Sequence, residues 1–223
     1  MPGSLSASPS GLPSSYRRLL IVGAGGFGRE VWNWARDAWG AAGPELVGFL
    51  DADPSKGGYA PVLGDPASFV PMPEDGLLLA IGIPRVRRRV AETLLARGGR
   101  FVTLVHPTAI IAPSAVLGAG SIVCPYGIVS DAAVTGACVL VNYHASLAHD
   151  ASAGEYAVFS PYATLAGDAH IGADTFLGLH AAVGPGRRLG DRCKVSANSA
   201  ALADAPADSI IYGVPGRIGR LIE

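Results

Sequence analysis

The sequence predicts a fold in two parts: a small Rossmann-like α/β domain with a parallel sheet, followed by an all-β left-handed parallel β-helix. Two patterns support this prediction. One is a six-residue hydrophobic repeat in the C-terminal half, and the other is a strand, glycine loop and helix near the N-terminus. We therefore expect a flexible tail over residues 1–16, the α/β domain over 17–105 and the β-helix with a C-terminal cap over 106–223.

The six-residue repeat predicts the β-helix. A helix repeats every 3.6 residues and a simple strand every two, so a period of six indicates a short strand plus a tight corner. Three such units close one triangular coil, with a large side chain inside and a small residue at each corner. The inward series is Ile111, Leu117, Val123, Val129, Thr135, Val141, Leu147, Ala153, Phe159, Leu165, Ile171, Leu177, Val183, Leu189 and Val195, and four residues after nearly every member stands a small residue.

Composition excludes several classes of function. Hydrophobic residues make up 49% of the chain and charged residues 16%, with a formal net charge of −1. Nucleic acids and anionic membranes both require a basic surface, so neither is expected as a partner. The three cysteines form no CxxC pair, and we interpret them as reduced thiols that fill small apolar spaces. No apolar run approaches the ~18 residues of a membrane span, and no signal peptide is recognised, so we expect a cytoplasmic protein.

The N-terminal half alternates strands and helices. Strands are expected over residues 18–23, 46–50, 77–81 and 101–105, with helices over 29–41 and 84–96. This alternation predicts a parallel sheet whose ligands gather beyond the carboxyl ends of the strands. The first strand enters a GxGxxG sequence that starts at Gly23, and the second ends on Asp51 and Asp53.

A GxGxxG loop between strand and helix lets phosphates approach the backbone, and a carboxylate such as Asp51 can accept hydrogen bonds from a ribose or base. Alone, the loop would suggest a nicotinamide dehydrogenase. However, the unit is short for a full dinucleotide fold and no hydride-transfer domain follows. We therefore favour a nucleotide or nucleotide-sugar ligand, with NAD binding and a purely structural glycine turn as alternatives.

These residues together resemble a known family. The segments "LLIVGAGGFGREV", "GFLDAD", "LLLAIG", "HPTAII", "AHDASAGEY", "GLHAAVGPG" and "YGVPGR" resemble the sialic-acid O-acetyltransferase-like group of hexapeptide-repeat acyltransferases, which includes bacterial nucleotide-sugar N-acetyltransferases. The resemblance covers about residues 17 to 220. It implies a homotrimer with active sites between neighbouring β-helices and acetyl-CoA as the cosubstrate, with no metal.

The resemblance also implies site residues. A catalytic His-Asp pair falls on His149 and Asp150. Contacts to acetyl-CoA fall on Val158, Gly167, Leu179 and Ala197. Contacts to the nucleotide of the sugar substrate fall on Gly23, Gly25, Gly26, Phe27, Asp51, Asp53 and Gly82.

The chemistry of acyl transfer suits the His-Asp pair. Transfer to an amine or hydroxyl needs a base to take the acceptor's proton, and imidazole titrates near neutral pH. A neighbouring carboxylate can fix the tautomer and stabilise the imidazolium that forms. Because His149 stands two places after the inward Leu147, its side chain should face outward. No cysteine lies at this site, which favours direct transfer over an acyl-enzyme.

One departure from the family concerns the acceptor. Many relatives carry a second histidine nine residues after the first, where this chain has Val158. We expect N-acetylation of a nucleotide-activated amino sugar in bacterial glycan biosynthesis, with sugar O-acetylation as the nearest alternative.

Two less favoured functions remain. His144 and His149 have the HxxxxH spacing of a zinc pair in γ-class carbonic anhydrases, but Thr108 stands where the third histidine is needed. A nucleotide-binding scaffold without catalysis is the other.

Overall fold

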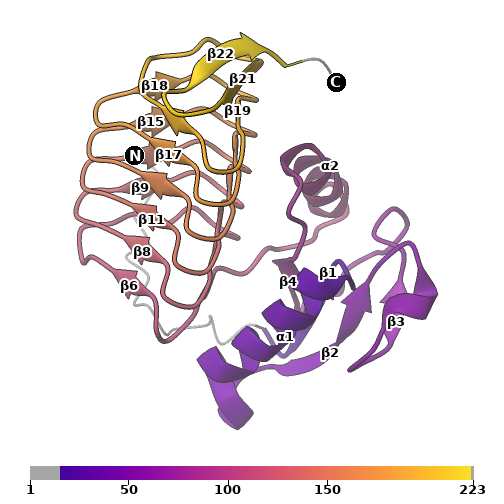
Figure 1. Cartoon of the computed structure of the whole chain (residues 1–223). Helices are drawn as coiled ribbons and strands as arrows, with labels where there is room; N and C mark the ends of the chain where they lie inside the picture. The colour runs from indigo at the N-terminus through magenta and orange to yellow at the C-terminus, as the bar shows by residue number, and fades with distance from the viewer. Residues whose placement is uncertain (1–15, 222–223) are drawn as a thin grey trace.

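The structure is a computed structural model that describes residues 16–221, so all but the last residue of the tail expected over 1–16 lies outside the described residues. Figure 1 shows two parts, an α/β domain and a β-solenoid of stacked coils, which lie side by side. The fold class predicted from the sequence is confirmed as a small parallel-sheet domain followed by a parallel β-solenoid.

The α/β domain has a four-stranded parallel sheet in the order β3-β2-β1-β4. Its helix α1 begins at the glycine loop, three residues earlier than expected, and β3 was not predicted. The elements are β1 (Arg18–Val22), α1 (Gly26–Trp39), the 3₁₀ turn η1 (Gly40–Ala42), β2 (Glu45–Leu50), the 3₁₀ turn η2 (Pro54–Lys56), β3 (Val62–Gly64), β4 (Asp75–Leu79) and α2 (Pro84–Leu95).

Alternation along the strands gives this sheet two apolar faces. Leu19 and Ile21 pack with Val31 of α1 on one face. Leu20 and Val22 pack with Leu94 of α2 on the other. A strand buried on both faces has a continuous hydrophobic sequence, which explains the run Leu-Leu-Ile-Val in β1.

The solenoid has three parallel sheets, and residues in register on neighbouring coils are 18 apart in sequence. Sheet 1 contains β5 (Leu104–Val105), β7 (Ile122–Val123), β10 (Leu140–Val141), β13 (Val158–Phe159), β16 (Phe176–Leu177), β19 (Lys194–Val195), β21 (Ser209–Tyr212) and, antiparallel to β21, β22 (Arg217–Arg220). Sheet 2 contains β6 (Ile110–Ile111), β8 (Ile128–Val129), β11 (Ser146–Leu147), β14 (Thr164–Leu165), β17 (Ala182–Val183) and β20 (Ala200–Ala201). Sheet 3 contains β9 (Val134–Thr135), β12 (Ser152–Ala153), β15 (His170–Ile171) and β18 (Arg188–Leu189).

The predicted six-residue phase is confirmed. Val123, Leu147 and Phe159 are among the inward residues that form one buried core along the solenoid, and alanines such as Ala133 and Ala163 are fully buried between them. At nearly every corner the second residue is left-handed. The non-glycine members are Tyr126, Ala132, Cys138, His144, Asp150, Tyr156, Tyr162, Asp168, Asp174, His180, Arg192, Asn198 and Asp208, with φ between 53° and 62°.

Three rows of corners run along the solenoid. The Tyr126 corner joins sheet 1 to sheet 2, and the His149 corner joins sheet 2 to sheet 3. The Cys138 corner joins sheet 3 back to sheet 1. Because a triangular coil has three faces, the His149 corner lies opposite sheet 1.

The strand expected over residues 101–105 is divided between the two parts of the chain. Phe101 forms a single bridge to Leu77 of the α/β domain, whereas Leu104 and Val105 pair with β7 of the solenoid. The apolar run was recognised correctly, but its partners were not. Hydrophobic pattern alone does not say which sheet a short strand joins.

The α/β domain packs on sheet 1 and on the Cys138 corner. Val31 of α1 belongs to the same buried cluster as Ile122 and Leu140, whose side chains face outward from sheet 1. At the corner, Arg88 of α2 donates to the Asp174 carboxylate at 2.7 Å and its guanidinium lies 4.4 Å from the centre of the Tyr156 ring.

A buried arginine joins the two parts. Arg87 of α2 donates to the carbonyl oxygens of Cys138 (2.7 Å), Leu79 (2.5 Å) and Ile81 (3.0 Å). Burial lowers the pKa of Arg87 to about 10, so the guanidinium stays charged at neutral pH. The residue therefore ties the end of β4 to the solenoid.

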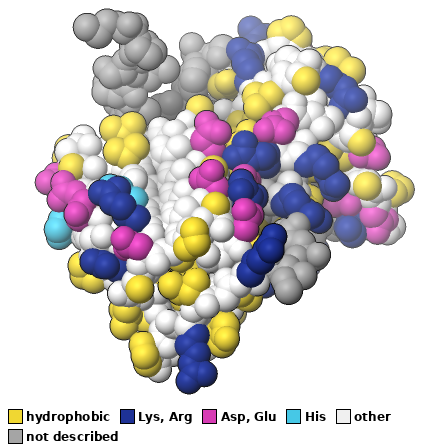
Figure 2. All heavy atoms as spheres, turned by 90° about the horizontal axis from the view of Figure 1, so that it is seen from above, with side chains coloured by type: hydrophobic (Ala, Val, Ile, Leu, Met, Phe, Trp, Pro, Cys, Tyr) yellow, Lys and Arg dark blue, Asp and Glu magenta, His cyan; other side chains and the backbone are white. Residues whose placement is uncertain are grey.

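The structure also shows the cysteines and the surface charges that the composition brought into view. Cys124, Cys138 and Cys193 are free and buried, and burial raises the pKa of the Cys138 thiol to about 11. On the face shown in Figure 2, acidic and basic side chains are interspersed. Among residues 16–221, no helix is both long enough and apolar enough to cross a membrane.

The solenoid core gives a stability prediction. Replacing Phe159, which is fully buried, by alanine should lower the free energy of unfolding by ~3–5 kcal/mol, because the stacked coils cannot collapse around the cavity. Ile110→Ala is the control, since Ile110 stands on a solenoid strand but is 62% exposed. Its effect should stay near ~0.5 kcal/mol. Equal losses in chemical denaturation would contradict the assignment of the core.

Candidate functional site

His149 and Asp150 form the predicted pair. Nδ1 of His149 lies 2.9 Å from Oδ2 of Asp150, and both side chains are about two-thirds exposed, at 67% and 62%. Asp150 has φ 59°, and its N–H donates to the Asp131 carbonyl on the coil below. The left-handed corner therefore turns the carboxylate back toward the preceding imidazole. This pairing places the proton on Nδ1 and leaves Nε2 free to accept one.

Gly167 lies directly beside this imidazole, one coil above it. A Cβ added to Gly167 would come within 2.6 Å of both Cε1 and Nε2 of His149. The side chain of any other residue at this position would displace the ring. The structure thus brings the predicted acetyl-CoA contact Gly167 and the predicted base His149 together.

A regular set of backbone donors lies at the corners. Within residues 16–221, the N–H groups of His149, Gly167, Leu179 and Ala197 donate to no acceptor. All four are the first residue of a corner, the position that Pro113, Pro125, Pro161 and Pro185 occupy on other coils. Proline has no N–H, so its recurrence there shows that the stacked sheets do not use this donor. Sequence reasoning missed this signal, although the proline spacing carries it.

The predicted acetyl-CoA contacts do not form one group within a chain. Gly167 belongs to the His149 corner, whereas Leu179 and Ala197 belong to the Tyr126 corner, on the other side of sheet 2. Val158 is separate from both. Its outward side chain is only 2% exposed because it faces the cluster that the α/β domain covers, so it has no access to a ligand in this arrangement.

The Tyr126 corner carries a ladder of stacked rings. Tyr126, His144, Tyr162 and His180 stack at centroid spacings of 4.9, 4.8 and 4.7 Å. His144 is therefore held between two tyrosines on a different corner from His149. No group of three or more His, Cys, Asp or Glu side chains comes together around a possible metal position in the described part of the chain. Within one chain, His144 and His149 therefore lie on different corners and not around a common position.

The glycine loop forms a site suited to an anion. Gly25 is the N-cap of α1 and makes no side-chain cap, and no acidic residue stands in the first turn of this helix. Its first N–H groups thus retain the partial positive charge of a helix N-terminus. A Cβ added at Gly25, Gly26 or Gly82 would meet at most one side-chain atom within 4 Å, the Arg29 Nη2 beside Gly26. The loop is consequently open where phosphates would approach.

Other glycines of the loop hold it in place. Gly23 has φ 106°, and a Cβ there would lie 2.7 Å from the Ala80 carbonyl. A Cβ on Gly28 would lie 1.9 Å from the Gly23 carbonyl, so Gly28 permits close contact between α1 and the loop. The Phe27 ring packs edge-to-face on the Trp34 ring, with the two ring centres 5.9 Å apart.

Asp51 braces the loop from the end of β2. Its Oδ2 accepts from the Ala24 N–H at 2.9 Å, and its Oδ1 accepts from the Asp53 N–H at 2.9 Å and from Lys56 at 3.3 Å. Burial raises the pKa of Asp51, but these hydrogen bonds outweigh burial and hold the pKa below its ordinary value. Asp53 accepts from the N–H and hydroxyl of Ser55, which also lower its pKa. Sequence reasoning placed Asp51 and Asp53 just after the second strand, where the structure has them, but missed their internal partners.

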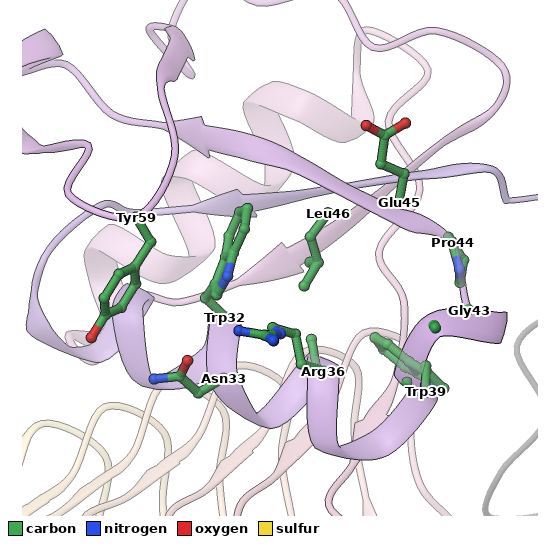
Figure 3. Close-up of a pocket in the computed structure, with 12 residues that line it drawn as sticks. Trp32, Asn33, Arg36, Trp39, Gly43, Pro44, Glu45, Leu46 and Tyr59 are labelled. Carbon is green, nitrogen blue, oxygen red and sulfur yellow. The ribbon is translucent and has the colours of Figure 1, made fainter.

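A separate pocket lies on the outer side of α1, away from the loop. It has a volume of about 680 Å³ and is lined by Trp32, Arg36, Trp39 and Tyr59 among others (Figure 3). None of the predicted site residues lines it. Trp32 stacks on Phe49 at 5.2 Å, so its ring also packs against the sheet.

The brace at Asp51 predicts acid sensitivity. Because the folded-state pKa is lowered, Asp51 stabilises the fold above its unfolded pKa of ~3.9, and this contribution is lost as the pH falls through the folded value. Asp51→Asn should cost ~1–2 kcal/mol at pH 7 and flatten the acid limb of stability. Denaturation between pH 7 and 2 measures both, and an unchanged acid limb would contradict the assignment.

Three comparisons with known proteins agree with this arrangement. The family description "PglD N-terminal domain" matches residues 18–94. A curated relative from Bacillus subtilis (strain 168), described as UDP-N-acetylbacillosamine N-acetyltransferase, is 34% identical over 117 residues, which cover 48% of this chain and 51% of the relative. The matched region thus spans about half the length of that relative.

Solved structures match over nearly the whole chain. The acetyltransferase domain of PglB from Neisseria gonorrhoeae FA1090, in complex with acetyl coenzyme A, has a TM-score of 0.84 and 29% identity, covering 91% of this chain and 98% of that one. PerB from Caulobacter crescentus, in complex with CoA and GDP-perosamine, has a TM-score of 0.80 and 29% identity, covering 90% and 96%. These matches support the resemblance, seen in the sequence, to hexapeptide-repeat acyltransferases of the sialic-acid O-acetyltransferase-like and bacterial nucleotide-sugar N-acetyltransferase group.

Proposed function

We propose that this protein transfers the acetyl group of acetyl-CoA to the amino group of a nucleotide-linked amino sugar, in bacterial glycan biosynthesis. The observation that carries the proposal is the His149–Asp150 pair, whose free Nε2 lies beside Gly167 on an exposed corner. Relatives of the same fold that are described with acetyl-CoA, or with CoA and GDP-perosamine, indicate the two substrates.

In the proposed reaction His149 acts as the general base. The amine of the sugar attacks the thioester carbonyl carbon, and Nε2 of His149 takes the proton that the amine loses. Asp150 accepts the hydrogen bond from Nδ1–H and stabilises the imidazolium that forms. The C–S bond then breaks, and the thiolate leaves as CoA after it receives a proton. Because the three cysteines are buried, direct transfer without a cysteinyl intermediate agrees with the structure.

Coenzyme A is proposed to bind along the corners. The unused N–H groups of Gly167, Leu179 and Ala197 can donate to the amide carbonyls of the pantetheine arm, which otherwise pair with water. These donors occur on two different corners that flank sheet 2. One pantetheine arm reaches both kinds of corner only if the His149 corner of one chain faces the Tyr126 corner of another.

The nucleotide site supports the same arrangement. The glycine loop belongs to the domain that covers sheet 1, whereas His149 lies on the corner opposite sheet 1. A sugar bound through its nucleotide at this loop is therefore directed to the His149 of a neighbouring chain. A cyclic homotrimer, in which every chain gives its loop to one neighbour and its His149 to the other, satisfies both requirements. Both substrates are cytoplasmic metabolites, so we place the reaction in the cytoplasm.

The direct test follows thiol release from acetyl-CoA with UDP-, GDP- and dTDP-linked amino sugars. Turnover should be fast with one amino sugar and fall by about 10² or more in His149→Ala, because the proton acceptor is lost. His170→Gln is the control, since His170 lies on β15 of sheet 3, outside the corners proposed to bind coenzyme A. It should retain the activity of the wild type to within a few-fold.

The possible contrary results separate the alternatives. Equal turnover in His149→Ala would show that His149 is not the base. Turnover only with hydroxyl acceptors would replace N-acetylation by sugar O-acetylation. Thermal stabilisation by a nucleotide sugar without any thiol release would indicate the non-catalytic scaffold.

The glycine loop predicts a second variant. Gly25→Asp places a favoured N-cap residue at the start of α1, so the fold should keep or gain stability. Its carboxylate also puts negative charge where the phosphates would bind, so the Kd of the nucleotide sugar should rise at least about 10-fold. Calorimetry with the preferred nucleotide sugar measures this Kd, and Gly98→Asp, remote from the loop, is the control. An unchanged Kd would place the nucleotide elsewhere.

A further inference from the structure

A second group of polar side chains lies on sheet 3, outside the proposed acetyl-transfer site. Oγ of Ser152 is 2.6 Å from Nδ1 of His170, and Nε2 of His170 is 3.1 Å from Oδ1 of Asp168. Serine, imidazole and carboxylate are thus connected in series by two hydrogen bonds. The proposed acetyl transfer uses none of these three residues.

The solenoid itself brings the three residues together. Ser152 and His170 are register partners on β12 and β15, and both side chains face outward because the next residue in each strand faces the core. Asp168 is the left-handed second residue of the corner just before β15, with φ 54°. Its N–H donates to the His149 carbonyl at 3.0 Å, which fixes the backbone from which the carboxylate reaches His170.

The hydrogen bonds define the protonation states. The Asp168 carboxylate can only accept from His170, so Nε2 carries the proton and Nδ1 has the free lone pair. Nδ1 then accepts from the hydroxyl of Ser152 at 2.6 Å. A nucleophile bonded to a base that is oriented by a third group is the arrangement that activates serine in hydrolases on unrelated folds. In general an imidazole can act as the base through either of its two nitrogens, so Nδ1 of His170 can take this role.

We propose that Ser152 is an activated nucleophile and that Ser152, His170 and Asp168 give this protein a second, hydrolytic activity toward small activated acyl esters and thioesters. In the first step Oγ of Ser152 attacks the acyl carbon and its proton passes to Nδ1 of His170. The bond to the leaving group then breaks, and His170 gives this proton to the departing alkoxide or thiolate. In the second step water attacks the acyl-serine and His170 takes a proton from that water. The bond between the acyl carbon and Oγ breaks, His170 returns the proton to Oγ of Ser152, and the carboxylic acid is released. The sum is ester plus water to acid plus alcohol or thiol.

The surroundings suit a small acyl group. On the coil below, Val134 is the register partner of Ser152 and is 43% exposed, so it offers an apolar surface beside the nucleophile. On the coil above, Arg188 is the register partner of His170 and supplies a positive charge to the same face. The side chains of His170 and Asp168 are 27% and 67% exposed, so a ligand has access to the group.

A neighbouring serine provides a matched control. Ser146 of β11 has the same outward place in its strand as Ser152, six residues earlier in the repeat. Its hydroxyl donates to Thr164 Oγ1 at 3.3 Å and has no imidazole partner. The two serines therefore differ chiefly in the base beside them.

The experiment treats the whole protein with a fluorophosphonate probe and locates the adduct by peptide mass spectrometry. We expect a stoichiometric adduct on Ser152 and none on Ser146. The rate of labelling should fall about 10²-fold or more in His170→Gln and to zero in Ser152→Ala, while Ser146→Ala behaves as the wild type. Hydrolysis of 4-nitrophenyl acetate should follow the same order.

Folding and the acetyl-transfer proposal are tested separately. Thermal unfolding of each variant shows whether a loss of labelling has a structural cause, and Asp168→Asn, which keeps the side-chain size, provides a second reduction in rate. Labelling needs neither acetyl-CoA nor a sugar, so its outcome does not depend on the proposed transferase activity. No adduct on Ser152 of the folded wild type, or equal labelling of folded His170→Gln, would overturn the proposal.

Discussion

The structure depends on one steric constraint, the left-handed turn at the second residue of each solenoid corner. This conformation costs a non-glycine residue ~1–2 kcal/mol, yet Tyr126, Asp150 and many others adopt it. The backbone hydrogen bonds between coils repay this cost, since each such N–H donates to the coil below, as Asp150 does to Asp131. Every corner side chain is consequently held at a fixed height and direction. The His149–Asp150 pair, the ring ladder and the Asp168–His170 contact all follow from this regularity.

The same regularity separates the parts of the proposed active site. Each chain has its nucleotide loop on the domain that covers sheet 1 and its His149 on the corner opposite that sheet. The Gly167 and Leu179 donors likewise occupy two corners with sheet 2 between them. A single chain therefore carries the expected groups on different sides of the solenoid. The homotrimer proposed above would bring them together, because a closed ring repeats one interface at every subunit.

Much of the fold and part of the candidate site could be predicted from the sequence. The six-residue phase identified the inward series through Val195, because a repeat reports local geometry that no distant contact alters. The resemblance to hexapeptide-repeat acyltransferases pointed to the His149–Asp150 pair, and the same phase placed the His149 side chain on the outside of the solenoid. The partners of short strands were not, and Leu104–Val105 joined the solenoid instead of the α/β sheet. Three further contacts could not be seen in the sequence. The Asp51 carboxylate accepts a hydrogen bond from the Ala24 N–H, and the α/β domain covers Val158. Arg87 is buried between the α/β domain and the solenoid. Each of these depends on contacts between segments far apart in the chain.

The central claim, that two chains form each active site, can be tested by mixing two variants that each impair one part of the site, at a sugar concentration well below the Kd of the Gly25→Asp variant. One chain carries His149→Ala and keeps its loop, and the other carries Gly25→Asp and keeps His149. Hybrid trimers purified through two different tags should regain about a third of wild-type turnover with acetyl-CoA and the preferred amino sugar, since one of the three sites then combines an intact loop with an intact histidine from another chain. Hybrids no more active than the two parent variants would contradict the claim and place the complete site within a single chain.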